Sequence, residues 1–171
     1  MTTANHSNPA PLAMAEQLLT SLLQCIREIQ QLAPQFPDEL HEARDPKNGM
    51  QVADFLERLA RHSQQHQREI AAIRASIGAA WPTDPNDAHP VTGQPYANTW
   101  YQAYLLEALL RRAELVGELI GLTDAEFTAP PDPKHTAGNT RSVKDVCEHV
   151  LRAQGWQMDG IRTGIEAHRC Q

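Results

Sequence analysis

Two histidines one helical turn apart are the residues of this sequence best placed to do chemistry. His62 and His66 occur in the stretch "ARHSQQHQREIAAIR". Residues four apart on an α-helix lie about 40° apart around its axis and about 6 Å apart along it, so both imidazoles can reach one point in front of the helix. Imidazole is a frequent ligand of divalent transition metals. The spacing therefore allows a shared metal ion, but it also fits an accidental pair on a helix surface.

The position of the pair on its helix bears on these alternatives. Both histidines fall on the apolar stripe that runs through Leu59, Ile70 and Ile73 in steps of three or four residues. A buried polar group without a partner costs about 1–3 kcal/mol. Two imidazoles on a core-facing stripe therefore need partners, and a metal ion is one such partner.

A metal site needs at least a third protein ligand, and His149 is the best candidate. It lies near the start of another expected helix, between Val146 and Val150. From the residues alone, a histidine bonded to a backbone carbonyl or a solvated histidine is favoured over a ligand at this position. The remaining histidines fall in tails, linkers or a last helical turn, where solvated side chains are expected: His6, His41, His89, His135 and His168.

Other residues that could take part in catalysis are few. Glu69 and Glu148 could act as outer carboxylates, and Glu148, beside His149, is the candidate for proton transfer. A nucleophilic pair of Cys147 with His149 is not expected, because residues two apart on a helix face apart. No Gly-rich phosphate loop, Ser-His-Asp pattern or paired-cysteine zinc motif occurs.

Four helices are expected to position these side chains, and no period-two strand pattern occurs, so the fold class is all-α. The first helix ends before Pro34, the second at Gly78 and the third at Gly121, and the fourth begins at Ser142 or Thr140. The four apolar stripes are Leu18, Leu19, Leu22, Leu23, Ile26 and Ile29; Val52, Phe55, Leu56, Leu59, Ile70, Ile73 and Ile77; Leu105, Leu109, Ala113, Val116 and Ile120; and Val143, Val146, Val150, Ala153, Ile161 and Ile165.

The chain is expected to form one four-helix-bundle domain over residues 1–171 made of two similar halves. Residues 1–12 read as a flexible tail, 13–79 as the first helix pair, 80–97 as a Pro-rich connection and 98–169 as the second pair. Asp45-Pro46-Lys47 answers Asp132-Pro133-Lys134, and Val52-x-Asp54-x-x-Glu57 answers Val143-x-Asp145-x-x-Glu148. These matches indicate a duplicated two-helix unit.

Composition excludes several classes of function. The net charge of −6 argues against a nucleic-acid partner, which requires a concentrated basic face. No apolar run is long enough for a membrane span, so no membrane partner is expected. The chain has three cysteines, an odd and small number: Cys25, Cys147 and Cys170. The sequence also shows no recognisable signal peptide. Together these features predict free thiols and a cytoplasmic location.

The segments around the histidines resemble one protein family. "NTRSVKDVCEHVLRAQGWQMDGI" resembles the helix of DinB/YfiT-like proteins that carries a single metal histidine in the pattern Ser-Val-x5-His. "LVGELIGLTDAEF" is similar to the end of that family's first helix and the following turn. "KNGMQVADFLERLARHSQQHQREIAAIR" is similar to its last helix, which carries His-x3-His. The resemblance implies that His62, His66 and His149 bind one divalent metal ion.

The resemblance also carries expectations about activity. It implies a DinB-like four-helix bundle, a homodimer, and a metal-dependent thiol S-transferase, isomerase or hydrolase that acts on a small-molecule substrate, such as a low-molecular-weight thiol. Zinc or nickel is the favoured ion, with iron or manganese as further options. The alternative is a non-catalytic, stress-related binding or scaffold bundle with a structural metal or none. The helix pairs occur in the reverse of the family's order, as in a circular permutation, so the site could form within one chain or across a swapped dimer.

Overall fold

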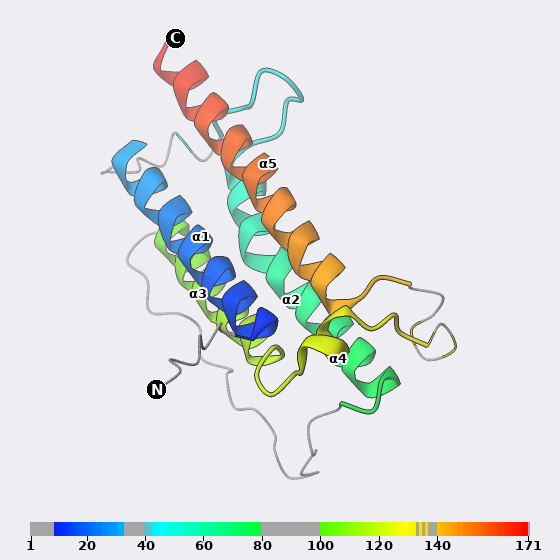
Figure 1. Ribbon diagram of the computed structural model, residues 1–171. Helices are drawn as coiled ribbons and strands as arrows, with labels where there is room; N and C mark the ends of the chain where they lie inside the picture. The colour runs from blue at the N-terminus through cyan, green and yellow to red at the C-terminus, as the bar shows by residue number, and fades with distance from the viewer. Residues whose placement is uncertain are drawn as a thin grey trace, which may run out of the picture.

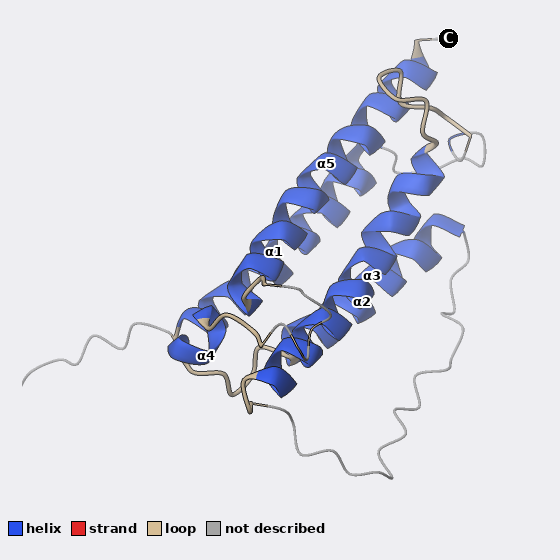
Figure 2. Cartoon of the chain, turned by 90° about the vertical axis from the view of Figure 1, so that its right-hand side faces the viewer, coloured by secondary structure: helices blue, strands red, loops and turns tan. Residues whose placement is uncertain are grey.

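The computed structural model describes residues 9–32, 40, 42–79, 100–132, 134, 136 and 140–170, and this part of the chain is helical without a strand (Figures 1 and 2). An isolated bridge between Arg44 and Gln51 is its one extended pairing. The all-α prediction is therefore confirmed. The helices are α1 (Ala10–Leu32), α2 (Val52–Ser76), α3 (Trp100–Gly117), α4 (Asp124–Thr128) and α5 (Val143–Arg169).

The four long helices match the four predicted segments, and two of their boundaries show why. Gly78, just after α2, has a φ of 77°, a left-handed conformation that glycine adopts without steric cost. Ser142, rather than Thr140, is the N-cap of α5, because its Oγ accepts a hydrogen bond from the backbone N–H of Asp145. The Asp145 carboxylate in turn accepts from the Ser142 backbone N–H. This reciprocal pair fixes where α5 begins.

The structure differs from the predicted helices at two places. Residues 10–12, assigned to the flexible tail, belong to α1, because Pro11 fits the first helical turn and the Ala10 backbone N–H donates to Asp124 Oδ1 at 2.8 Å. The short helix α4 was not predicted, although Thr123 and Glu126 form a capping box at its start. Residues 1–8, the Pro-rich connection at 80–97, and His6, His41, His89 and His135 lie outside the described residues.

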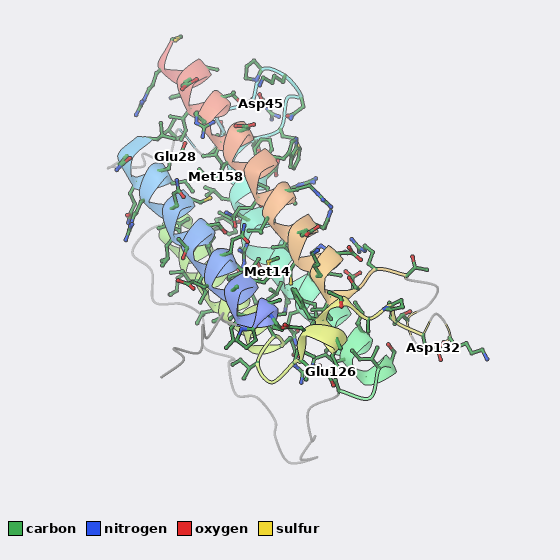
Figure 3. The ribbon with its side chains drawn as sticks, in the orientation of Figure 1. Met14, Glu28, Asp45, Glu126, Asp132 and Met158 are labelled. Atoms are coloured by element: carbon green, nitrogen blue, oxygen red, sulfur yellow. The ribbon has the colours of Figure 1, made fainter. Side chains whose placement is uncertain are left out.

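The repeated sequence signature has the same local structure in both halves. The backbone N–H of Lys47 donates to Asp45 Oδ1 at 3.0 Å, and that of Lys134 donates to Asp132 Oδ1 at 2.9 Å. Asp54 repeats the role of Asp145, since it accepts from the N–H of the residue that precedes its helix. Asp45 and Asp132 lie toward opposite ends of the long helices (Figure 3). The two halves are thus locally alike and run in opposite directions.

The helix pairs pack closely through α2, which contacts both α3 and α5, while α1 contacts α5 and α3 (Figure 1). Glycine allows the approach of α5 to α2. The Phe55 ring of α2 lies where a Cβ on Gly160 would be, and Val52 lies close to the corresponding position on Gly164. α4 packs against α5 and against the start of α1.

The apolar core consists of two clusters with polar residues between them. On α2, Ser63 and His66 lie between Ala60 of one cluster and Ile70 of the other. On α3, Arg112 occupies the corresponding place and is 1% exposed. The stripe predicted on α3 is therefore only partly right. Leu105 is buried and Leu109 and Val116 pack half-buried against the core, whereas Ala113 and Ile120 are exposed. The buried positions that the stripe left out are Ala108, Arg112, Leu115 and Leu119.

The stripe predicted on α1 was too wide. Leu19 and Leu23 are 37% and 45% exposed, whereas Leu18, Leu22 and Ile29 are fully buried. In the part of the chain that the structure describes, no helix has both the length and the apolar character needed to cross a membrane.

Candidate metal centre

Three histidines converge where α2 faces α5. One nitrogen from each of His62, His66 and His149 lies within 4.8 Å of the others. The Nε2 atoms of His62 and His66 are 3.1 Å apart. The His149 ring centroid lies 5.3 Å from that of His62 and 4.9 Å from that of His66. The predicted convergence of these three side chains is thus present in the fold.

The helices position the three imidazoles in different ways. α2 supplies His62 and His66 from successive turns, and α5 supplies His149 two turns after its capped start. His66 is buried, whereas His62 and His149 are partly exposed. On α5 the neighbours Val146, Cys147 and Val150 are fully buried. The cluster therefore lies at the edge of the core, with two of its three imidazoles partly exposed to solvent.

A carboxylate supports the buried member of the cluster. Glu69 Oε2 is 2.6 Å from His66 Nδ1, and Arg141 donates to Glu69 Oε1 at 2.6 Å. Because a carboxylate only accepts, His66 carries its proton on Nδ1 and directs the lone pair of Nε2 toward His62. In this arrangement Nε2 of His66 carries the lone pair, faces His62 Nε2 at 3.1 Å and is the atom that would bind a metal ion.

The surroundings favour neutral imidazoles. Burial, together with the neighbouring His66 and His149, lowers the pKa of His62 to about 4. Burial also lowers the pKa of His149, with a further contribution from His66 and from nearby arginines. Metal binding requires deprotonated ligands. At neutral pH His62 and His149 are therefore in the protonation state that a metal ion needs.

A buried arginine joins the site to the rest of the core. Arg112 Nε donates to Ser63 Oγ at 3.0 Å, Nη1 to the Leu18 carbonyl at 2.8 Å and Nη2 to Gln154 Oε1 at 2.8 Å. Burial lowers the pKa of Arg112 to about 10, so it remains a cation at neutral pH. Its charge also disfavours protonation of His62. One guanidinium on α3 thus forms hydrogen bonds with residues of α1, α2 and α5.

The donor set fits a divalent metal ion. Two imidazole nitrogens bound to one zinc ion at about 2.0–2.1 Å in tetrahedral geometry lie about 3.3 Å apart. The 3.1 Å between the two Nε2 atoms is close to this separation. Among the described residues, this is the one group of three or more histidine, cysteine or acidic side chains with metal-binding spacing. The three imidazoles are therefore suited to hold one ion with a coordination position left for another ligand.

The two carboxylates considered from the sequence have different surroundings. Glu69 contacts His66, whereas Glu148 is 42% exposed and forms an ion pair with Lys144 at 3.8 Å. The proton-transfer role of Glu148 stays a prediction. All three cysteines are free thiols, as expected, and burial raises the pKa of Cys147 to about 12.

Sequence reasoning missed Arg112 and Arg141. An apolar stripe does not reveal a buried charged residue, although Arg112 shares the helical spacing of Ala108 and Leu115. Arg141 comes directly before the N-cap of α5, and its sequence position alone gives no sign of its contact with α2. The i,i+3 spacing of His66 and Glu69 was a visible signal for the carboxylate.

Comparisons with protein-family models, curated proteins and solved structures find no match to this chain.

Proposed function

We propose that His62, His66 and His149 bind one divalent metal ion and that the protein is a metal-dependent enzyme. The convergence of three imidazole nitrogens within 4.8 Å, with His66 Nδ1 2.6 Å from the Glu69 carboxylate, is the observation that carries this proposal. Structural zinc sites usually have four protein ligands, whereas catalytic sites keep a position open. Three protein ligands therefore favour a catalytic ion over a structural one.

The chemistry of the ligands limits what such a site can do. An ion held by three neutral imidazoles would keep its full positive charge and lower the pKa of a thiol or water molecule that reaches it. The residues themselves would bind the ion, and burial lowers the pKa of His62 and His149, which favours their neutral form, while His66 lies buried on the core side. This supports a thiol S-transferase, isomerase or hydrolase, with a low-molecular-weight thiol as the favoured co-substrate.

The resemblance to DinB/YfiT-like proteins is part of the same proposal. The Ser142-Val143-x5-His149 and His62-x3-His66 patterns supply the three converging residues. We accordingly propose a DinB-like four-helix bundle with its helix pairs in permuted order, cytoplasmic and homodimeric. Zinc or nickel is the favoured ion, with iron or manganese as further options; imidazole ligands by themselves suit zinc, nickel, copper and iron alike.

The first experiment measures bound metal after purification and after reloading with zinc or nickel. The wild type should bind one ion per chain, and replacing His62, His66 or His149 with alanine should remove most of it. His168→Ala is the matched control, because His168 lies in the last turn of α5, away from the cluster. If His149→Ala retains its metal, the three-ligand site is wrong and the non-catalytic scaffold is the better description.

A second experiment addresses the open position. The cobalt-loaded protein should change its absorption spectrum when cysteine or glutathione is added, because a thiolate entering the coordination sphere gives an intense charge-transfer band. An unchanged spectrum at millimolar thiol would argue against thiol chemistry while leaving a hydrolytic role in place.

A further inference from the structure

A single carboxylate connects the two helices that supply the proposed metal ligands. Glu69 on α2 is 2.6 Å from His66 Nδ1 through one oxygen and accepts from Arg141 at 2.6 Å through the other. The His66 side chain is 3% exposed and that of Glu69 is 15% exposed. The contact between them is therefore largely shielded from water, where a hydrogen bond to a charged group is strongest.

The contact with His66 selects one tautomer. A neutral histidine carries its proton on Nδ1 or on Nε2, and the second ring nitrogen then has the lone pair. The Glu69 carboxylate can only accept, so it holds the proton on Nδ1. The lone pair of His66 Nε2 then points at His62 Nε2, 3.1 Å away. His66 thus already has the tautomer that a ligand needs, so metal binding does not require a tautomer change at this residue.

The contact with Arg141 acts on the third ligand. Arg141 directly precedes Ser142, the N-cap that fixes the start of α5. His149 follows two turns later on the same helix. Holding Arg141 against Glu69 therefore holds the start of α5 against α2 at the level of the site. The ion pair spans 72 positions of sequence, so it links the two halves of the chain.

We infer that Glu69 and Arg141 are positioning residues of the metal site, with Glu69 setting the tautomer of His66 and the pair setting the place of His149. This inference rests on the proposed function, since it concerns the same three ligands. Carboxylates that orient metal-bound histidines typically change metal affinity by about 10–100-fold when they are removed. A carboxylate with no contact to a ligand should have no such effect.

The test compares Glu69→Gln with Glu57→Gln in zinc titrations of the metal-free protein. Glu57 is a matched control, because it is a glutamate of the same helix that pairs with Arg61 and not with a proposed ligand. Glu69→Gln should weaken zinc binding by about 10–100-fold, and Glu57→Gln should leave it unchanged. Helical content and thermal unfolding, measured on the same samples, identify a loss caused by misfolding.

A second readout separates positioning from general support of the fold. Nitrogen-15 spectra of histidine-labelled, metal-free protein report which ring nitrogen of His66 carries the proton. The wild type should show the Nδ1–H form, and Glu69→Gln should show a mixture, because a carboxamide can either donate or accept. If Glu69→Gln does not fold, Glu69→Asp serves instead, since its shorter carboxylate should also lose the 2.6 Å contact.

Arg141→Gln tests the second arm at a side chain that is 41% exposed. It should weaken zinc binding, whereas Lys144→Gln should leave it unchanged, because Lys144 is similarly exposed (48%) near the start of α5 but pairs with Glu148 instead of Glu69. The outcomes are distinguishable. If the wild type binds zinc and Glu69→Gln has the same zinc affinity and the same His66 tautomer, the positioning role alone is overturned. If the wild type does not bind zinc, the proposed function is overturned.

Discussion

Gly160 determines how closely α5 can approach α2, and replacing it with alanine should destabilise the protein. A Cβ at this position would lie 2.2, 2.3 and 2.5 Å from Cζ, Cε1 and Cε2 of Phe55. Non-bonded carbons normally stay about 3.5–4.0 Å apart. The Phe55 ring would have to move by more than about 1 Å, yet it is fully buried and packs edge-on against Trp156 with centroids 5.2 Å apart. The two helices must therefore separate, or the ring must leave its place.

The expected magnitude combines two opposing effects. Overpacking a well-filled core costs about 1–3 kcal/mol, and more where the backbone must shift. Alanine regains about 0.5–1 kcal/mol of helix propensity over glycine. Gly160→Ala should thus lower the free energy of unfolding by about 1–2 kcal/mol. For a chain of this size that corresponds to a fall of about 2–8 °C in the melting temperature.

Gly155→Ala is the matched control on the same helix. Nothing lies within 4 Å of the Cβ that this change would add, so only the propensity gain should remain, and the protein should become more stable by about 0.5–1 kcal/mol. Thermal and urea unfolding of both variants give the comparison. Adding Phe55→Leu to Gly160→Ala should recover at least about 1 kcal/mol, because it removes the atoms that the methyl group would meet. Equal stability of the two alanine variants would refute this account of the α2–α5 contact.

Three further predictions concern the core and its titratable groups. The pKa of His62 is about 4 in the fold, compared with 6.5 for an ordinary histidine. Between these two pH values the unfolded chain therefore binds more protons than the native protein. The metal-free protein should therefore lose about 1–3 kcal/mol of stability as pH falls through this window, and His62→Gln should flatten the urea-unfolding profile; an unchanged pH dependence would contradict this. A thiol reagent at pH 8 should label the exposed Cys170 quickly, whereas Cys25 and Cys147 should react only after unfolding, because burial raises the pKa of both thiols. Early labelling of Cys147 would contradict its burial. Cys147→Ala should retain bound metal. Arg112→Met should cost about 2–4 kcal/mol, because it leaves the groups that accept from the guanidinium without their donor, and wild-type stability in urea would show that this hydrogen-bonded layer is unimportant.

Helix existence and most helix ends could be predicted because they depend on local rules. Gly78 and Ser142 mark boundaries through backbone conformation and side-chain capping, both of which the sequence displays directly. α4 obeys the same rules through Thr123 and Glu126, but five residues are too few for a periodic stripe. Its stability comes from packing of the buried Phe127 and from the contact with α1, neither of which is local.

The faces of the helices were harder to predict, because burial depends on neighbours far along the chain. Where apolar residues occupy adjacent positions, as in Leu18-Leu19 and Leu22-Leu23, the sequence does not show which of the two faces the core until the packing partners of the helix are known. On α3 the buried face contains Arg112, whose charge excluded it from the predicted stripe. Its burial is possible because Ser63, Gln154 and a carbonyl of α1 each accept one of its hydrogen bonds.

The three candidate ligands could be identified from the sequence, but of the residues that support them only Glu69 could be identified in this way. His62 and His66 share a helix, so their spacing fixes their separation, and the segment match added His149. The contact of Glu69 with His66 follows the same helical geometry. Arg141 reaches Glu69 across 72 positions, a proximity that only the packing of α5 on α2 creates.

The buried guanidinium has a consequence for which half of the chain can pair with which. Residues 13–79 supply Ser63 and the Leu18 carbonyl as acceptors, and residues 98–169 supply Arg112 and Gln154. Two copies of the second half placed together would bury two like charges without a hydroxyl to receive either, and two copies of the first would have no cation to satisfy their acceptors. Although the two halves have similar local sequence and structure, the buried charge of Arg112 requires that each half pack against the other and not against a copy of itself. Two separately expressed halves should therefore assemble as a one-to-one heterodimer in preference to either homodimer.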